Sequence, residues 1–271
     1  MAQVLTAHGG FALTAADRAR LQRRAAEALR RARRHGEALA AITVAVDPAT
    51  DPTAVVAASR RVGEPWFCFE QPDRDRAALG ALGVVMAIES AGPDRFKLAA
   101  ARWRVLASQA ACDPPDGPRG CGPIAVGGFA FAPEGGSDPH WAGYAPASLH
   151  VPEAALVRRG ADVRLTLCAL ATPDDTVDDL VARLERRAAE LRTDVPLPLL
   201  DPDPAGRYRV NSAMPPEHYE QAVARAVERI RGGELQKVVL AREVQVHAPV
   251  DHDPAAVLGV LREAFPACHL V

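Results

Sequence analysis

One lysine inside an apolar run has the clearest chemical potential in this sequence. Lys237 directly precedes residues 238–240, which are Val, Val and Leu and pack well in a buried strand. Strand alternation would place Lys237 on one face with Val239 and Ala241. Burial disfavours the charged form of a lysine, so this position is expected to lower the pKa of Lys237 from about 10.4. A shift of about three units, or roughly 4 kcal/mol, would make it a base at neutral pH. The alternative is that Lys237 begins the strand and extends its ammonium group into water, while its stem covers apolar surface.

The sequence around Lys237 resembles the opening of the chorismate-binding region of isochorismate synthases. The resemblance runs from Tyr219 through the Gly232-Gly233 pair and along residues 234–242. Anthranilate and aminodeoxychorismate synthases usually carry an uncharged residue, commonly Gln, at the place of Lys237, whereas isochorismate and salicylate synthases carry Lys. The resemblance therefore implies that Lys237 is the catalytic base that activates water, rather than part of an ammonia-using site.

Two earlier stretches carry the same resemblance. Residues 124–131 resemble the glycine-aromatic strand in the first half of these synthases, and residues 64–72 resemble their early strand. The likeness extends from about residue 40 onward and is strongest between 215 and 271. It implies an α+β chorismate-binding fold, with two sheet-rich halves packed together and helices outside.

The resemblance also implies that this chain is C-terminally truncated. Family members continue past the strand that begins within residues 265–271, and their general-acid glutamate, Mg²⁺-binding glutamates and carboxylate-binding arginine lie in that later part. We therefore expect residues 1–194 to form the N-terminal half, residues 195–206 a Pro-rich linker, and residues 207–271 the incomplete start of the catalytic region. Mg²⁺ is the expected cofactor, with its ligands outside this chain.

The function that follows is isochorismate synthase, an isomerase. Chorismate, the expected small-molecule substrate, would gain water at C2 and lose its C4 hydroxyl in a Mg²⁺-dependent reaction. One alternative is salicylate synthase, which uses the same lysine and then eliminates pyruvate. Another is a non-catalytic remnant or interaction module, since the fragment alone is expected to be inactive. Whether the product enters menaquinone or siderophore biosynthesis stays open.

Composition favours a cytoplasmic protein. The 271 residues are 48% hydrophobic with a net charge of −2, which gives no reason to expect a nucleic-acid or membrane partner. The N-terminus lacks a basic segment followed by an apolar core, and no segment offers 18 uncharged apolar residues. Oligomeric state stays open. An odd number of scattered cysteines indicates a reducing compartment; they are Cys68, Cys112, Cys121, Cys168 and Cys268.

Alternating helices and strands are expected to position Lys237 and the two earlier stretches at 64–72 and 124–131. Helices are predicted from apolar periodicity, capping residues and Gly or Pro borders at 15–35, 94–111, 176–191, 216–231 and 254–264. Strands are predicted from aliphatic and aromatic content at 39–46, 64–69, 82–89, 124–131, 149–158, 163–170 and 237–242. Residues 113–120 are expected to form a loop because Pro and Gly interrupt regular pairing.

Two helices are expected to bury an apolar stripe. In 94–111 the predicted core positions are Phe96, Ala99, Ala100, Trp103 and Leu106. In 216–231 they are Tyr219, Val223, Ala226, Val227 and Ile230.

Other patterns favour simpler interpretations. The arginine-rich helix at 15–35 could be a nucleic-acid arm or a membrane-surface helix, but a solvated face is preferred because the rest of the chain balances its charge. Asp251-His252-Asp253 has metal-ligand residue types, yet adjacent residues converge poorly on one ion, and Asp253 is an expected helix cap. The Gly127-Gly128 pair lacks a dinucleotide-binding context and is expected to permit a bulge or a close backbone approach.

Overall fold

The computed structural model describes residues 10–114, 116–136, 139–201 and 206–271, in two compact units. One unit comprises residues 1–199 with 254–271, and the other comprises residues 200–253. The first boundary between the two units, after Leu199, falls within the predicted linker at 195–206. Residues 254–271 belong to the first unit, and not with residues 207–253 as predicted. The N-terminal segment, Pro115 of the predicted loop and residues 202–205 of the predicted linker lie outside the described residues.

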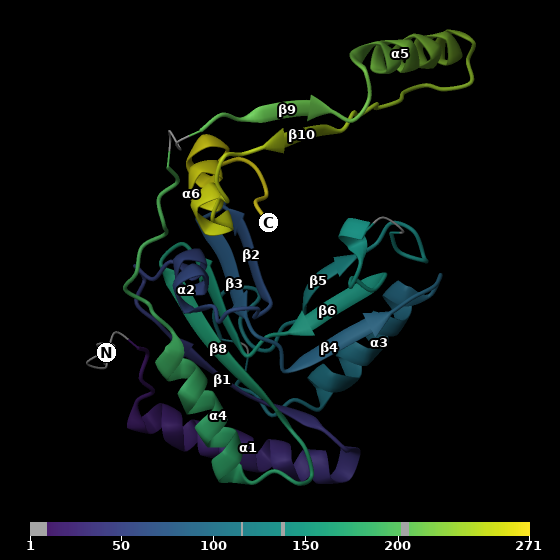
Figure 1. The fold of residues 1–271 in the computed structure, drawn as a ribbon. Coiled ribbons are helices and arrows are strands. Elements are labelled where there is room, and N and C mark those ends of the chain that lie inside the picture. The colour runs from purple at the N-terminus through teal and green to yellow at the C-terminus, as the bar shows by residue number, and fades with distance from the viewer. Residues whose placement is uncertain (1–9, 115, 137–138, 202–205) are drawn as a thin grey trace. The chain divides into compact units, whose positions relative to one another are not determined.

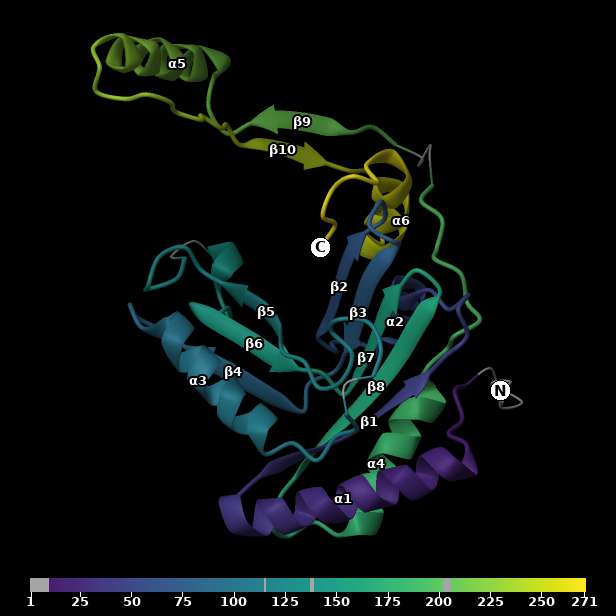
Figure 2. The ribbon, with the colours of Figure 1, turned by 180° about the vertical axis from the view of Figure 1, so that it is seen from behind.

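The core of the first unit is a five-stranded antiparallel sheet in the order β1-β8-β7-β3-β2. Helices α1 and α4 cover its β1–β8 side, and the short helix α2 lies against β3 and β2 (Figures 1 and 2). The large apolar side chains buried between these layers include Leu21, Ile42 and Leu184. The strands are β1 (Ala38–Ala45), β2 (Trp66–Gln71), β3 (Ala77–Leu82), β7 (Ala154–Arg159) and β8 (Asp162–Ala171).

Helices α1 (Ala15–His35) and α4 (Val177–Glu190) form where the sequence predicts them. Each begins with a reciprocal capping box, in which the hydroxyl of Thr14 or Thr176 accepts from a backbone N–H and an aspartate three residues on accepts in return. Helix α2 (Pro52–Ser59) is an additional, unpredicted element. It begins with Asp51 as N-cap and a proline at the first turn, where the missing N–H has no cost.

Several arginines of α1 form ion pairs with neighbouring elements and within α1 itself. Arg20 and Arg24 both contact Asp113, at 3.3 Å each, and Arg18 pairs with Glu185 of α4 at 2.7 Å. The Asp113 carboxylate also accepts from the backbone N–H of Thr43 in β1. Part of the basic face is therefore used to hold α1 against its neighbours.

A second sheet has three antiparallel strands in the order β4-β6-β5, and α3 (Arg95–Ser108) packs on β4 and β6. Within α3, Ala99 and Leu106 are buried as predicted, whereas Phe96 is 50% exposed. The ring of Phe96 instead lies 4.7 Å from that of Phe129 in β5. The strands are β4 (Met86–Ser90), β5 (Val126–Phe129) and β6 (Ala147–Val151), and a short 3-10 helix spans Pro139–Trp141.

Two predicted strands are each divided between the two sheets. The predicted strand at 82–89 is wrong as a single element, because β3 ends at Leu82 and Gly83 then takes a φ of 71° before β4 begins. The predicted strand at 149–158 likewise breaks at Pro152, between β6 and β7. A left-handed glycine and a proline without an N–H both interrupt a ladder, and here they carry the chain from one sheet to the other.

The C-terminal segment belongs to the first unit. Helix α6 (Pro254–Ala264) forms as predicted and buries Ala255, Ala256 and Leu258. The expected strand within 265–271 is reduced to a single antiparallel bridge between Leu270 and Glu70.

The second unit contains a hairpin of β9 (Arg209–Ser212) with β10 (Val244–His247), and α5 (Pro216–Arg231) lies between these strands in sequence. The predicted buried face of α5 is wrong for this unit, because no residue of α5 is buried. The predicted strand at 237–242 is also wrong, since these residues have no regular structure and β10 begins only at Val244. A strand needs a ladder partner, and the apolar face of a helix needs a covering layer. Among the described residues 206–253, no strand pairs with residues 237–242 and no layer covers α5.

Candidate functional site

Lys237 lies in an extended segment that follows α5. The helix ends at Gly232-Gly233 as predicted, and Gly233 adopts a φ of 78°, which favours glycine. The N–H of Gly233 donates to the Ile230 carbonyl and the N–H of Glu234 to the Arg229 carbonyl, both at 3.0 Å. These bonds close the helix end and direct the chain into the Lys237 segment.

The Lys237 segment, residues 234–243 between α5 and β10, contacts α5 near the N-terminal end of that helix. The Tyr219 hydroxyl donates to the Leu240 carbonyl at 3.5 Å, and the Arg242 guanidinium lies 5.9 Å from the centroid of the Tyr219 ring. Lys237 itself is exposed. The burial expected from its sequence is therefore not realised within this unit, and its role as a base stays a prediction.

A large cleft lies in the first unit between the two sheets. Its volume is about 1280 Å³, above the range of roughly 300–1,000 Å³ usual for small-molecule pockets. Residues 64–67 line one side and residues 126–132 the other, so the fold brings together the two stretches that resemble the synthase family. The aromatic residues that line it are Trp66, Phe67, Phe129, Phe131, Trp141 and Tyr144.

The glycine-aromatic strand is shaped by a close backbone approach at the cleft wall. Gly127 has a φ of 148°, and a Cβ placed there would lie 2.1 Å from the Ser148 carbonyl oxygen of β6. A Cβ on Gly128 would meet nothing within 4 Å. The predicted reason for a glycine is therefore confirmed at Gly127 and does not apply to Gly128.

An ion-pair network includes Arg61 and Glu64, which line the other side of the cleft. Arg187 of α4, which is nearly fully buried, contacts Glu64 at 2.7 Å, Glu190 at 3.1 Å and Glu153 at 3.2 Å. Arg61 reaches Glu190 at 2.5 Å and Glu153 at 3.3 Å. Burial alone would raise the pKa of Glu190, but hydrogen bonds from Arg61 and Arg187 outweigh it and hold that pKa below its ordinary value. Sequence patterns did not reveal this network, because Arg187 is one of several arginines in an amphipathic helix.

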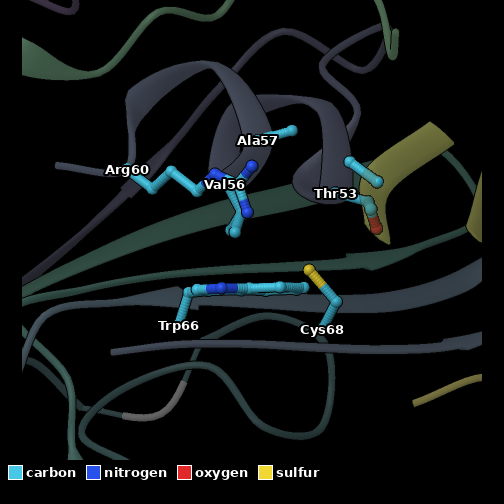
Figure 3. A pocket seen from close by; sticks show the side chains of 7 residues that line it. Thr53, Val56, Ala57, Arg60, Trp66 and Cys68 are labelled. Atoms are coloured by element: carbon cyan, nitrogen blue, oxygen red, sulfur yellow. The ribbon is translucent and has the colours of Figure 1, made fainter. Parts of the chain in front are cut away.

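A smaller hollow near the start of β2 is already filled by side chains. Trp66 and Cys68 point from β2 toward Thr53 and Val56 of α2 (Figure 3), and the Arg60 guanidinium lies 5.5 Å from the Trp66 ring centroid. The hollow has no space for a water molecule. Burial raises the pKa of the Cys68 thiol to about 12, so this thiol is not a ready nucleophile.

The described residues contain no group of three or more His, Cys, Asp or Glu side chains that could hold a metal ion. His252 instead lies against Tyr208, with 3.4 Å between its Nε2 and the Tyr208 hydroxyl. Among the described residues, no helix is both long and apolar enough to cross a bilayer.

Together, the described residues define an α+β protein: one unit has a five-stranded and a three-stranded antiparallel sheet with an aromatic-lined cleft, and a separate unit carries Lys237 and a two-stranded antiparallel sheet. The chain belongs to the family described as chorismate binding enzyme, whose model matches residues 24–271. The same α+β fold occurs in MenF, the menaquinone-specific isochorismate synthase from Escherichia coli, with a TM-score of 0.55 and 20% identity. That match covers 90% of this chain and 50% of MenF. The predicted fold class is confirmed.

Two curated proteins are similar in sequence. The salicylate biosynthesis isochorismate synthase of Pseudomonas aeruginosa is 32% identical over 225 residues, which are 83% of this chain and 45% of that protein. Anthranilate synthase component 1 of Haloferax volcanii is 33% identical over 113 residues, 40% of this chain and 20% of that protein. The chain thus spans about half the length of the isochorismate synthases that it matches.

Proposed function

We propose that this chain is the part of an isochorismate synthase that carries the catalytic base. The observation that supports this most is the extent of the family match, which runs over residues 24–271 and therefore includes Lys237. Among the matched relatives, both the Pseudomonas aeruginosa protein and MenF are named isochorismate synthases. Lysine at this position, rather than Gln, favours water over ammonia as the nucleophile.

In the proposed reaction Lys237 removes a proton from a water molecule. The water oxygen bonds to C2 of chorismate, the ring double bonds shift, and the C4 hydroxyl leaves with a proton as water. The net change is an isomerisation with no added oxidant or reductant. A positioned general base typically contributes 10²- to 10⁴-fold to such a step.

Lys237 needs a covering surface to act in this way. A lysine becomes a base near neutral pH when burial disfavours its ammonium form, and Lys237 is exposed in the described unit. The relatives are about twice as long as the matched region. We propose that polypeptide equivalent to their remaining half covers Lys237 and supplies the general acid.

We propose Mg²⁺ as the cofactor of the complete enzyme. Its ligands are proposed to lie in the part of the enzyme that is equivalent to the unmatched half of the relatives. The substrate is proposed to be chorismate, without a nucleic-acid or membrane partner, and the location cytoplasmic, consistent with five cysteines that form no disulfide.

Salicylate synthase is the second candidate, supported by the same lysine and by the salicylate-biosynthetic role in the name of the Pseudomonas aeruginosa relative. The two roles differ in their products, which are isochorismate alone in the first and salicylate together with pyruvate in the second. Protein expressed at the full length encoded by its gene is incubated with chorismate and Mg²⁺, and the products are separated by chromatography while pyruvate is measured with lactate dehydrogenase. Isochorismate without pyruvate supports the proposal. Salicylate with equimolar pyruvate supports the second candidate, and no product supports a non-catalytic module.

A further inference from the structure

We propose that residues 254–271 form a latch, a segment that closes on the first unit through Arg262 and can open without unfolding the sheet beneath it. This inference does not depend on the proposed enzymatic activity. It concerns how the chain returns to the first unit after the residues 200–253 that form the second unit.

Arg262 of α6 bridges two carboxylates that are distant in sequence. Its Nε donates to Glu70 Oε2 at 2.7 Å and its Nη2 to Glu70 Oε1 at 2.5 Å. Its Nη1 donates to Asp51 Oδ2 at 2.6 Å. Burial alone would lower the pKa of Arg262, but the bonds to Glu70 and Asp51 outweigh it and raise that pKa, so this guanidinium is held as a cation.

The two carboxylates form a site that the first unit holds in place by itself. Glu70 lies in β2 and also accepts from the Thr53 hydroxyl of α2, while Asp51 caps α2 by accepting from the backbone N–H groups of Thr53 and Ala54. Glu70 is 3% exposed. This partly buried negative site is therefore built from β2 and α2, the buried Arg158 of β7 interacts electrostatically with both carboxylates, and the latch adds a second cation, Arg262.

Backbone pairing adds a second attachment. The N–H of Glu70 donates to the Leu270 carbonyl at 2.9 Å, and the N–H of Leu270 donates back at 3.0 Å. The N–H of Asp73 donates to the Pro266 carbonyl at 3.1 Å. The bridge at Glu70 pairs one residue of β2, the edge strand of the five-stranded sheet, and the bond to Asp73 lies just past the end of that strand.

The attachment has an apolar part, formed by three leucines and two alanines, and a charged part, formed by Arg262. The latch buries Ala255, Ala256, Leu258 and Leu270; the two leucines join the edge of the main hydrophobic core, and the partly buried Leu261 packs against it. The five-stranded sheet has its own layers of large aliphatic residues on α1, α4, β1 and β8. Loss of the charge bridge should therefore release the latch while the sheet persists, because local opening follows the units with the fewest buried contacts.

Hydrogen exchange with mass spectrometry on the full 271-residue chain tests the latch. The variant is Arg262→Gln, which removes the charge but keeps a polar side chain of intermediate length. The matched control is Arg159→Gln, which breaks an exposed pair with Asp75 in the same unit. Three peptides are compared, covering 66–76, which contains the Glu70 and Asp73 amides, 254–271, and 162–171 of β8.

The latch predicts at least about tenfold faster exchange at 66–76 and 254–271 in Arg262→Gln, with 162–171 unchanged and Arg159→Gln unchanged throughout. Unchanged exchange in all three peptides would overturn the proposal. Faster exchange at 162–171 as well would also overturn it, because residues 254–271 would then be an integral part of the core. Asp51→Asn serves as a milder second variant, since asparagine still caps α2, and it should accelerate the same two peptides to a lesser degree.

Discussion

Arg187 and Glu64 form an almost fully buried ion pair, 2.7 Å apart, that joins helix α4 to the residues lining one wall of the cleft. Their side chains are 3% and 6% exposed. Removing one partner of such a pair leaves the other charge buried without compensation, which is far more costly than losing a surface pair.

We therefore predict that Arg187→Met lowers the free energy of unfolding by about 3 kcal/mol, measured by urea denaturation at pH 7. Methionine keeps most of the side-chain volume, so the loss reports the charge rather than a cavity. The neighbouring Arg186 is exposed, and Arg186→Met should change stability by less than about 0.5 kcal/mol. Equal effects of the two substitutions would refute the structural role of this pair.

The glycine pair at the cleft wall gives a second prediction. Gly127→Ala should destabilise the protein by about 2 kcal/mol or more, because the added methyl meets the Ser148 carbonyl and the backbone is in a region that disfavours side chains. Gly128→Ala should be tolerated within about 1 kcal/mol, since its Cβ has open space. Thermal unfolding of the two variants beside the parent protein measures the difference. A Gly128→Ala variant as damaged as Gly127→Ala would contradict this account of the strand.

Acid should weaken the attachment of α6 through Asp51. Burial alone would raise the pKa of Asp51, but its hydrogen bond and charge interaction with Arg262 hold that pKa below its ordinary value. A carboxylate with a lowered folded-state pKa stabilises the fold above its unfolded pKa of about 3.9, and this contribution is lost as pH falls through the folded value. Unfolding free energies measured from pH 7 to pH 3 should show Asp51→Asn less stable than the parent at pH 7, with the gap closing below about pH 4. A gap that stays constant across this range would show that the charge of Asp51 contributes nothing.

Thiol reactivity should separate the cysteines by burial. Burial raises the pKa of both Cys68 and Cys168 to about 12, so only about one thiol in 10⁴ is ionised at pH 8. Cys268 is exposed. Brief treatment with iodoacetamide, followed by peptide mass spectrometry, should modify Cys268 and leave Cys68 and Cys168 intact. Modification of Cys68 as fast as Cys268 would mean that the contacts around β2 and α2 are not formed in solution.

Local patterns predicted helices α1, α3, α4, α5 and α6, whereas α2 was not predicted. Helix α1 spans the predicted residues. Both α1 and α4 begin with a capping box between residues three positions apart, so the start of each helix is determined by nearby residues in the sequence. The division of two predicted strands at Gly83 and Pro152 is different in kind. Each break depends on which of two sheets the chain joins next, and that choice is made by pairing between distant residues.

The environment of Lys237 could not be predicted from its own segment. Alternation among residues 237–242 indicates a strand with a buried face, but strand formation and burial both require partners. Within the described second unit, α5 and the Lys237 segment have exposed apolar residues, including Val227, Ile230 and Val239. The alternation of apolar residues therefore describes a surface suited to contact further polypeptide. This is why the burial predicted from the sequence differs from the exposure of Lys237 in this unit.

The most direct test concerns Lys237 itself. The sequence contains two lysines, Lys97 and Lys237, and Lys97 is exposed on α3. Isochorismate formation is measured with the protein at the full length encoded by its gene, comparing Lys237→Ala and Lys237→Gln with Lys97→Gln as the matched control. We predict that both Lys237 variants lose at least about 100-fold in kcat/KM, in line with removal of a general base, while Lys97→Gln retains the parent activity. Undiminished isochorismate formation by Lys237→Ala would contradict the assignment of Lys237 as the base.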